Sequence, residues 1–183
     1  RRGRRRAGAV AADCEPVYLD ATAATGFLPD LDALSPELLA RTVAFYLATP
    51  ANPQGSVASR DYLARVAALA QQHNFMLFAD ECYSEIYGDE APPGALETVY
   101  AGTRSFANVV AFQSLSKRSG LPGLRSGFVA GDPDFIAVFG RFRNVACLPH
   151  ARDRQATALE EPLHRAAVHR IVVHDEQGAR DRR

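Results

Sequence analysis

The stretch that decides the fold and the chemistry of this chain is Ser114–Gly127, which reads SLSKRSGLPGLRSG. It holds Lys117, the only lysine among the 183 residues. A lysine amine can be unprotonated near neutral pH and attack a carbonyl carbon, whereas an arginine guanidinium stays charged. Lys117 is therefore a candidate for covalent attachment to a carbonyl compound, although a solvated surface lysine is an equally ordinary use of this residue.

Short apolar runs surround this stretch and predict strands. Val109–Phe112 leads into it, and Gly127–Gly131 follows it. Earlier in the chain, Val43–Leu47 and Phe75–Ala79 are continuous apolar runs, typical of strands that are covered on both faces. Val17–Leu19 is a shorter β-prone segment. The four longer runs each end in polar or glycine-containing turns, so we expect their strands to deliver loops to the rim of a sheet.

Helical spacing separates these strands. The segment that starts near Ser59 or Asp61 places Leu63, Val66 and Ala70 on one face, which predicts an amphipathic helix. Strand, helix and strand in this order imply a right-handed parallel crossover. Residues 30–41 and 136–145 also show helical spacing, whereas we expect residues 22–29 to form a loop and the Pro- and Gly-rich residues 88–103 to form a surface excursion.

Composition sets limits on the class of protein. Lysine plus arginine equals aspartate plus glutamate at 21 each, so no net field would attract nucleic acid or an anionic membrane. The three cysteines, Cys14, Cys82 and Cys147, form no C-x-x-C pair, which argues against a disulfide framework or a zinc site and favours a reducing cytoplasm. No apolar run approaches the roughly 20 residues of a membrane-spanning helix. The histidines at 164, 169 and 174 lack metal-ligand spacing.

The chain divides into three parts by sequence character. We expect the arginine-rich residues 1–16 to be disordered, because they show no periodicity. Residues 17–148 carry all the strand and helix patterns. Residues 149–183 are an atypical tail rich in Arg, His and Ala, in which only Ile171–Val173 offers a segment to bury; we expect this tail to be poorly packed or disordered.

Polar side chains gather where the predicted strands end. They are Asn52, Asp80, Tyr83, Ser114, Ser116, Lys117 and Arg125. Taken singly, each has a structural explanation, such as a turn former, a helix cap, a core aromatic or a surface cation. Together they match the needs of pyridoxal 5'-phosphate: an amine for its aldehyde, a carboxylate for its ring nitrogen, donors for its ring oxygen, and hydroxyls with an arginine for its phosphate.

Three motifs in this order resemble the large domain of class I/II aminotransferases, the fold-type I pyridoxal phosphate enzymes. They are Asn52-Pro53-Gln54-Gly55, Asp80-Glu81-Cys82-Tyr83, and Ser114-Leu115-Ser116-Lys117 with Arg125 eight residues later. The resemblance implies an α/β fold with a mixed, mostly parallel sheet flanked by helices. It also implies transamination between an amino acid and a 2-oxo acid, carried out by a homodimer.

The resemblance assigns a role to each residue. Lys117 is the catalytic residue, which binds the cofactor aldehyde as an imine and then moves protons, and we expect burial and nearby positive charge to keep its amine partly unprotonated. Asp80 pairs with the ring nitrogen, and Asn52 and Tyr83 donate hydrogen bonds to the ring oxygen. The phosphate is held by Ser114, Ser116 and Arg125.

Residues 116–132 are more narrowly similar to N-succinyldiaminopimelate aminotransferases, which use 2-oxoglutarate as the second substrate. That group usually has Asn where this chain has Gly120. The resemblance extends from about residue 17 to residue 148, about a third of such an enzyme, so we expect the chain to be truncated at both ends. The part that carries the substrate-binding arginine has no counterpart.

Three alternatives remain open at the level of sequence. A lyase or decarboxylase on the same fold would use the same cofactor-holding residues. A nucleotide hydrolase is suggested by the apolar strand before Asp80 and Glu81, but it would need a phosphate loop around a lysine, and Lys117 lies in a different context. The third alternative is a non-catalytic fragment of an aminotransferase that keeps the sheet and performs no reaction.

Overall fold

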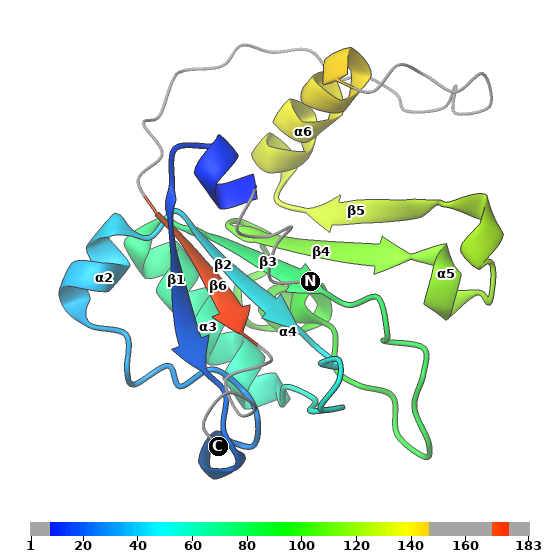
Figure 1. Ribbon diagram of the computed structural model, residues 1–183, viewed down its shortest axis with the longest axis horizontal. Coiled ribbons are helices and arrows are strands. Elements are labelled where there is room, and N and C mark those ends of the chain that lie inside the picture. Colours follow the sequence, from blue (N-terminus) through cyan, green and yellow to red (C-terminus); the bar gives the residue numbers. More distant parts are fainter. Residues whose placement is uncertain (1–7, 147–169, 176–183) are drawn as a thin grey trace.

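The computed structural model of the chain describes residues 8–146 and 170–175. A six-stranded sheet in the order β1-β6-β2-β3-β4-β5 forms its centre (Figure 1). Every neighbouring pair is parallel except β4 and β5, which are antiparallel. The strands are β1 Glu15–Asp20, β2 Ala44–Ala48, β3 Met76–Asp80, β4 Val109–Ser114, β5 Gly127–Gly131 and β6 Arg170–Asp175. The predicted mixed, mostly parallel sheet is therefore confirmed.

Helices α2 to α6 lie between the described strands or follow them, and α2 and α3 each begin after a serine that caps them. Ser35 and Ser59 accept hydrogen bonds of 3.2 Å from Leu38 N and Tyr62 N in the first turns of α2 and α3. The helices are α2 Pro36–Arg41, α3 Arg60–His73, α4 Ala95–Thr103, α5 Leu115–Arg118 and α6 Pro133–Ala146. The unit β2–α3–β3 joins two adjacent parallel strands, as predicted.

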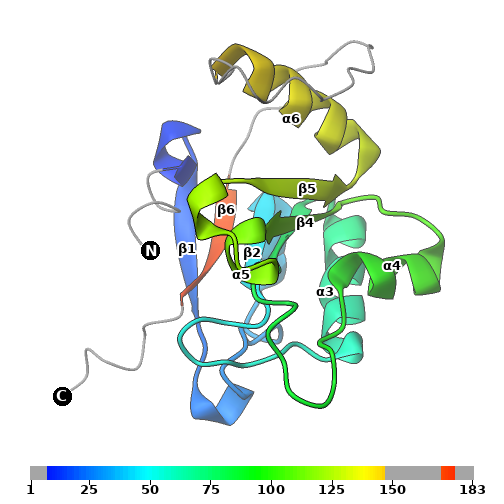
Figure 2. The ribbon, with the colours of Figure 1, turned by 90° about the vertical axis from the view of Figure 1, so that its right-hand side faces the viewer.

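The main core lies between the sheet and helices α3 and α4, which cover the same face (Figure 2). Phe45 and Leu47 are two positions apart in β2, so their side chains point to this same face of the sheet. Both are fully buried, as is Leu77 of β3. Burying one such side chain stabilises the fold by about 1.5–3 kcal/mol. The face of α3 that is turned to the sheet carries its four buried residues, Leu63, Val66, Ala67 and Ala70.

Aromatic rings form a line on the opposite face of the sheet. Phe78 of β3 lies at the centre of this line, with its ring centroid 5.0 Å from Tyr46 of β2 and 5.5 Å from Phe112 of β4. Its ring is also 5.1 Å from Phe135, which belongs to α6. Helix α6 is therefore attached to the sheet through aromatic contacts.

Several expectations from the sequence were wrong. Residues 95–103 form helix α4 rather than a surface excursion, because Thr98 and Val99 are buried against the core. The helix expected over residues 30–41 begins only at Pro36. Residues 8–16, expected to be disordered, include a helical turn at 8–11 and the start of β1, and Ala9 and Cys14 are buried.

The tail also contributes to the fold. Residues 170–175 form β6, which pairs with β1 on one side and with β2 on the other. The boundary drawn at residue 149 therefore does not separate the tail from the sheet. The remaining expectations for the tail, including those for His164 and His169, and the expectation for the first seven residues fall outside the described residues.

Glycine at position 131 is required by the close pairing of β4 and β5. Gly131 is opposite Val110 in the antiparallel ladder and has φ of +139°, a conformation that residues with a side chain rarely adopt. A Cβ atom placed there would collide with the backbone carbonyl of Val109. Helix α6 begins two residues later, at Pro133.

We predict that Gly131→Ala lowers the free energy of unfolding by about 1–3 kcal/mol, the usual cost of forcing extra atoms into a packed site. The measurement is urea unfolding followed by far-ultraviolet circular dichroism. Gly140→Ala is the matched control, because an added Cβ there meets no heavy atom within 4 Å. As a helical Gly→Ala change it should raise stability by about 0.5–1 kcal/mol. Similar losses in both variants would contradict the steric argument.

Candidate active site

The carboxyl ends of β2, β3 and β4 meet at one edge of the sheet. Asp80, the last residue of β3, lies in register between Ala48 of β2 and Phe112 of β4. Two backbone hydrogen bonds continue the ladder beyond the strands: Thr49 N donates to Asp80 O at 3.1 Å, and Glu81 N donates to Phe112 O at 3.0 Å. The loops with the predicted site residues therefore leave the sheet side by side, where open α/β sheets bind ligands.

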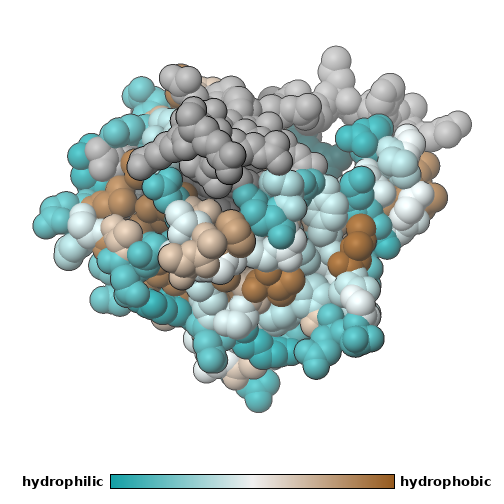
Figure 3. All heavy atoms as spheres, turned by 60° about the horizontal axis from the view of Figure 1, so that its bottom comes forward, coloured by the Kyte–Doolittle hydropathy of each residue, from teal (hydrophilic) through white to brown (hydrophobic). Residues whose placement is uncertain are grey.

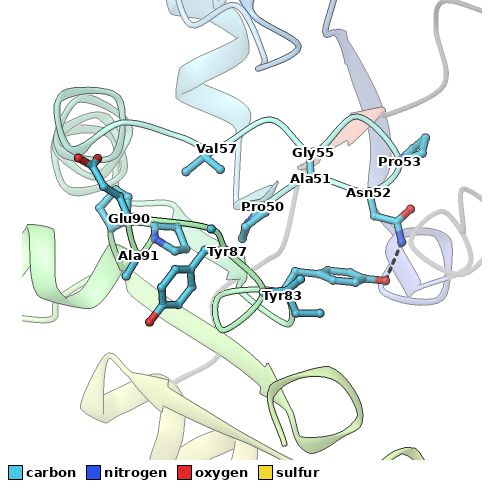
Figure 4. A pocket seen from close by; sticks show the side chains of 14 residues that line it. Pro50, Ala51, Asn52, Pro53, Gly55, Val57, Tyr83, Tyr87, Glu90 and Ala91 are labelled. Atoms are coloured by element: carbon cyan, nitrogen blue, oxygen red, sulfur yellow. Dashed lines mark hydrogen bonds between the residues drawn. The ribbon is translucent and has the colours of Figure 1, made fainter. Parts of the chain in front are cut away.

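Asn52 and Tyr83, which follow β2 and β3, are in direct contact. Nδ2 of Asn52 donates a hydrogen bond of 2.7 Å to the hydroxyl oxygen of Tyr83 (Figure 4). The loop around Asn52 is fixed by Thr49, whose buried hydroxyl accepts a hydrogen bond of 3.0 Å from Ala58 N. The structure thus brings these two predicted site residues together from positions 31 residues apart.

A pocket of 730 Å³ lies beside this pair, between the loop of residues 50–57 and the loop of residues 83–93 (Figure 4). Its walls are mostly proline, alanine and aromatic side chains, and Glu90 is its one acidic residue. Lys117 and Asp80 are not among the lining residues. Apolar side chains are exposed at several places on the surface (Figure 3), and those near the pocket include Val57 and Ile86.

The single turn of α5 places Lys117 next to Tyr83. Its Nζ atom lies 5.9 Å from the centroid of the Tyr83 ring. The neighbouring Arg118 forms an ion pair of 3.2 Å with Glu85, and its guanidinium lies 5.7 Å from the centroid of the Phe128 ring. These contacts tie α5 both to the loop after β3 and to β5. The expected burial of Lys117 is wrong for this chain, because α5 lies at the surface and the lysine side chain is exposed.

The predicted phosphate-holding residues form a second contact group. Nη1 of Arg125 is 3.4 Å from Ser116 Oγ and 3.2 Å from the Pro122 carbonyl oxygen. Arg125 has φ of +48°, in the left-handed region, and its bond to Ser116 directs the guanidinium toward α5. Ser114 caps α5, since its Oγ accepts a hydrogen bond of 3.3 Å from Ser116 N. Two hydroxyls and one guanidinium therefore gather where α5 begins.

The seven predicted site residues all lie at this edge, but they do not share one enclosed pocket. Asn52, Tyr83 and Lys117 form one contact group, and Ser114, Ser116 and Arg125 form the other. Half-buried Asp80 lies on the central strand, and its Oδ1 accepts a hydrogen bond of 3.4 Å from Cys82 N. Arg125 also lines a separate pocket of 380 Å³ that includes residues of β4, β5 and α6.

Sequence reasoning quoted Glu81 within a motif but gave it no role, and the structure shows it to be deeply buried. Its side chain is 6 % exposed, and its carboxylate accepts hydrogen bonds from Ala95 N at 2.7 Å and from Gln113 Nε2 at 3.1 Å. Burial raises the pKa of Glu81 above its ordinary value, the two hydrogen bonds oppose that rise, and neighbouring Asp80 adds to it. The only signal in the sequence was its place next to Asp80.

Two features are absent from the described residues, 8–146 and 170–175. No three side chains of His, Cys, Asp or Glu in these ranges come together as metal ligands. Within the same ranges, no helix combines the length and apolar character needed to cross a membrane.

Comparisons with known proteins agree on one family. Residues 6–171 match the sequence profile described as "Aminotransferase class I and II". An LL-diaminopimelate aminotransferase of Desulforudis audaxviator is 36% identical over 138 residues, which cover 75% of this chain and 34% of that protein. This chain therefore spans about a third of the length of such relatives.

Solved structures give the same result. The crystal structure of an aminotransferase from Neisseria meningitidis superimposes with a TM-score of 0.68 at 40% identity, covering 73% of this chain and 34% of that one. A probable N-succinyldiaminopimelate aminotransferase from Thermus thermophilus gives a TM-score of 0.61 at 30% identity, covering 66% of this chain and 32% of that one.

The raised pKa of Glu81 predicts a dependence of stability on pH. Because the folded chain binds this proton more tightly than the unfolded chain, Glu81 contributes most to stability below its ordinary pKa of 4.5. That contribution is lost as the pH rises from there through the raised pKa of the folded state. The free energy of unfolding of the wild type minus that of Glu81→Gln should therefore fall with rising pH.

The measurement is urea unfolding at a series of pH values. Glu97→Gln is the control for loss of a carboxylate alone, because Glu97 lies in the first turn of α4 and forms an exposed ion pair of 2.7 Å with Arg60. The free energy of unfolding of the wild type minus that of Glu81→Gln could instead stay constant from pH 4 to pH 8, or rise. Either result would show that burial does not control the pKa of this carboxyl group.

Proposed function

The chain belongs to the class I and II aminotransferase family, and we propose that it forms the cofactor-holding part of an enzyme that transfers an amino group from an amino acid to a 2-oxo acid. In that reaction the donor leaves as a 2-oxo acid and the acceptor leaves as an amino acid. Members of the family are pyridoxal phosphate enzymes. The observation that carries the proposal is the convergence of Asn52, Tyr83 and Lys117 at the strand edge that also holds Asp80.

The residues of this chain fit that cofactor by the chemistry of their donors. Bound pyridoxal phosphate supplies an aldehyde for attachment to an amine and a ring that accepts electrons. The Asn52 amide carries two N–H donors, and the Tyr83 hydroxyl carries one O–H donor. Both side chains can therefore donate to one anionic ring oxygen placed between them.

The remaining roles follow from charge and position. The Lys117 amine, next to Tyr83, would attach to the aldehyde and hold or return a proton at the reacting carbon. The Asp80 carboxylate would favour a proton on the ring nitrogen, because opposite charges stabilise each other. Ser114, Ser116 and Arg125 would bind the phosphate through two hydroxyls and a guanidinium.

The same proposal extends to the class of amino donor and acceptor. Similarity to an LL-diaminopimelate aminotransferase and to a probable N-succinyldiaminopimelate aminotransferase supports a diaminopimelate-type amino donor. The resemblance in sequence implies 2-oxoglutarate as the acceptor. Action in a reducing cytoplasm is supported by the wide separation of the cysteines in the sequence. We also propose that the whole protein is a homodimer, as the resemblance in sequence implies.

A second candidate is a cofactor-binding piece that performs no transamination. It is favoured by the exposure of Lys117. The two candidates differ in one measurement: only the first would convert an amino acid donor to a 2-oxo acid while a 2-oxo acid acceptor is converted to an amino acid.

We predict that pyridoxal phosphate followed by borohydride leaves a pyridoxyl group on Lys117. The measurement is peptide mass spectrometry of the reduced chain, with the visible absorbance of the imine recorded beforehand. Lys117→Arg keeps the charge but lacks a nucleophilic amine, so it should lose the modification completely. A folded wild-type chain that remains unmodified at Lys117 would reject the cofactor assignment.

Arg125 is predicted to recognise the phosphate rather than the ring. Arg125→Ala should weaken binding of pyridoxal phosphate by about 10- to 150-fold, which corresponds to the 1.5–3 kcal/mol of a hydrogen bond to a charged group, and should leave binding of phosphate-free pyridoxal unchanged. Arg104→Ala is the control, because Arg104 is also an exposed arginine in the left-handed region, at the end of α4. Equal weakening for both ligands would show that Arg125 does not contact the phosphate.

A further inference from the structure

Glu81 connects three elements that meet behind the candidate active site. It directly follows Asp80 at the end of β3, one carboxylate oxygen accepts from Ala95 N at the start of α4, and the other accepts from Gln113 Nε2 in β4. Gln113 is hydrogen-bonded at its other end, where its Oε1 accepts from Ser84 Oγ at 3.3 Å.

The chain of contacts Ala95–Glu81–Gln113–Ser84 links the two loops that carry the site. Ser84 follows Tyr83, and Gln113 precedes Ser114, so the network fixes one side chain beside each of them. Glu81 and Gln113 are separated by 32 positions in the sequence. Besides this network, the turn after β3 and the end of β4 are joined by the backbone bond from Glu81 N to Phe112 O and by the weak contact from Cys82 Sγ to the same oxygen.

We propose that Glu81 is a positioning residue of the active site, which sets the Asp80–Tyr83 turn against the Ser114–Lys117 segment through Gln113 and Ser84. This inference rests on the proposed function, because it concerns the two loops assigned to the cofactor. The geometry assigns Glu81 no contact with substrate, cofactor or reacting atoms.

Helix capping accounts for only half of the geometry. The N-cap residue of α4 is Gly94, which has no side chain to bond the exposed N–H groups of the first turn, and Glu81 supplies an acceptor there. A cap needs one oxygen on the helix end. The second carboxylate oxygen of Glu81 accepts a hydrogen bond from Gln113 in β4, and capping of α4 alone would not require that bond.

The burial of Glu81 makes the arrangement specific. A carboxylate removed from water is costly unless its oxygens are hydrogen-bonded, so Glu81 favours the one placement in which both donors reach it. The donors belong to α4 and β4, and Glu81 itself belongs to the site loop. Displacement of either site loop would therefore leave a buried acceptor without its partner.

The first test needs no cofactor. Hydrogen–deuterium exchange of the whole chain should become about tenfold faster in Glu81→Ala at residues 82–84 and at residues 114–116 together. Gln113→Ala, which leaves the Ala95 contact intact, should give the same result at both segments. Glu97→Gln, which removes an exposed carboxylate from α4, should leave the exchange of both segments unchanged.

The second test uses the cofactor. Glu81→Ala and Gln113→Ala should each raise the dissociation constant of pyridoxal phosphate by about tenfold and shift the pH midpoint of its imine absorbance. The double variant should be no worse than either single variant, because the two residues act as one unit. Glu81→Gln should restore affinity to within about twofold: with the Gln113 amide rotated, a hydrogen bond forms again at each of the three contacts.

The possible results distinguish a positioning role of Glu81 from a helix cap, and both from a failure of the proposed function. If Glu81→Ala lowers the unfolding midpoint but leaves exchange at residues 114–116 and cofactor affinity unchanged, Glu81 is only a cap for α4, and the proposal is wrong. Damage by Glu81→Gln equal to that by Glu81→Ala would also overturn it. If Glu81→Ala does not fold, Gln113→Ala and Glu81→Gln decide the same question. Absence of a Lys117 adduct in the wild type would reject the proposed function, while the exchange experiment would still measure the link between the loops.

Discussion

The parallel hydrogen-bond ladder of β2, β3 and β4 is the constraint on which the rest of the structure depends. Its register puts Asp80 between Ala48 and Phe112, and neighbouring strands lie about 4.8 Å apart. Residues that leave the three strands at one edge are therefore within about 10 Å of one another, whatever their distance in the sequence. A cofactor ring that is contacted by side chains from different strands requires that spacing. The buried side chains beneath α3 hold the ladder in place.

The strands and the long helices could be predicted from the sequence because their signals are local. Phe45 and Leu47 lie in a continuous apolar run, and the Ser59 side chain caps α3 by accepting a hydrogen bond from Tyr62 N in the first turn. Helix α4 was missed because the Pro-Pro-Gly sequence at residues 92–94 dominates the local pattern, while its cap comes from Glu81, 14 positions away. The place of β6 between β1 and β2 also depends on partners far away in the chain.

The same distinction separates the two halves of the site. Motifs identified the groups with chemistry to perform, because an amine, a carboxylate and a guanidinium are recognisable by residue type. They did not identify the residues that fix those groups. The ion pair between Arg118 and Glu85, or the bond between Glu81 and Gln113, joins loops more than 30 positions apart and leaves no periodic trace. The exposure of Lys117 likewise depends on what covers α5, which residue type does not reveal.

Charge is unevenly distributed along this edge of the sheet, and that distribution bears on how a ligand would lie. The acidic residues Asp80 and Glu81 are at the end of the central strand, whereas Lys117 and Arg125 belong to the segment after β4. Arg118 is partly neutralised by Glu85, so Lys117 and Arg125 carry most of the positive charge directed toward a ligand. A ligand with a protonated nitrogen at one end and a phosphate at the other gains from one orientation and loses from the reverse. An oppositely turned ligand would place its phosphate near the Asp80 carboxylate, where like charges repel each other. The strand order alone therefore favours one direction of binding before any shape complementarity is considered.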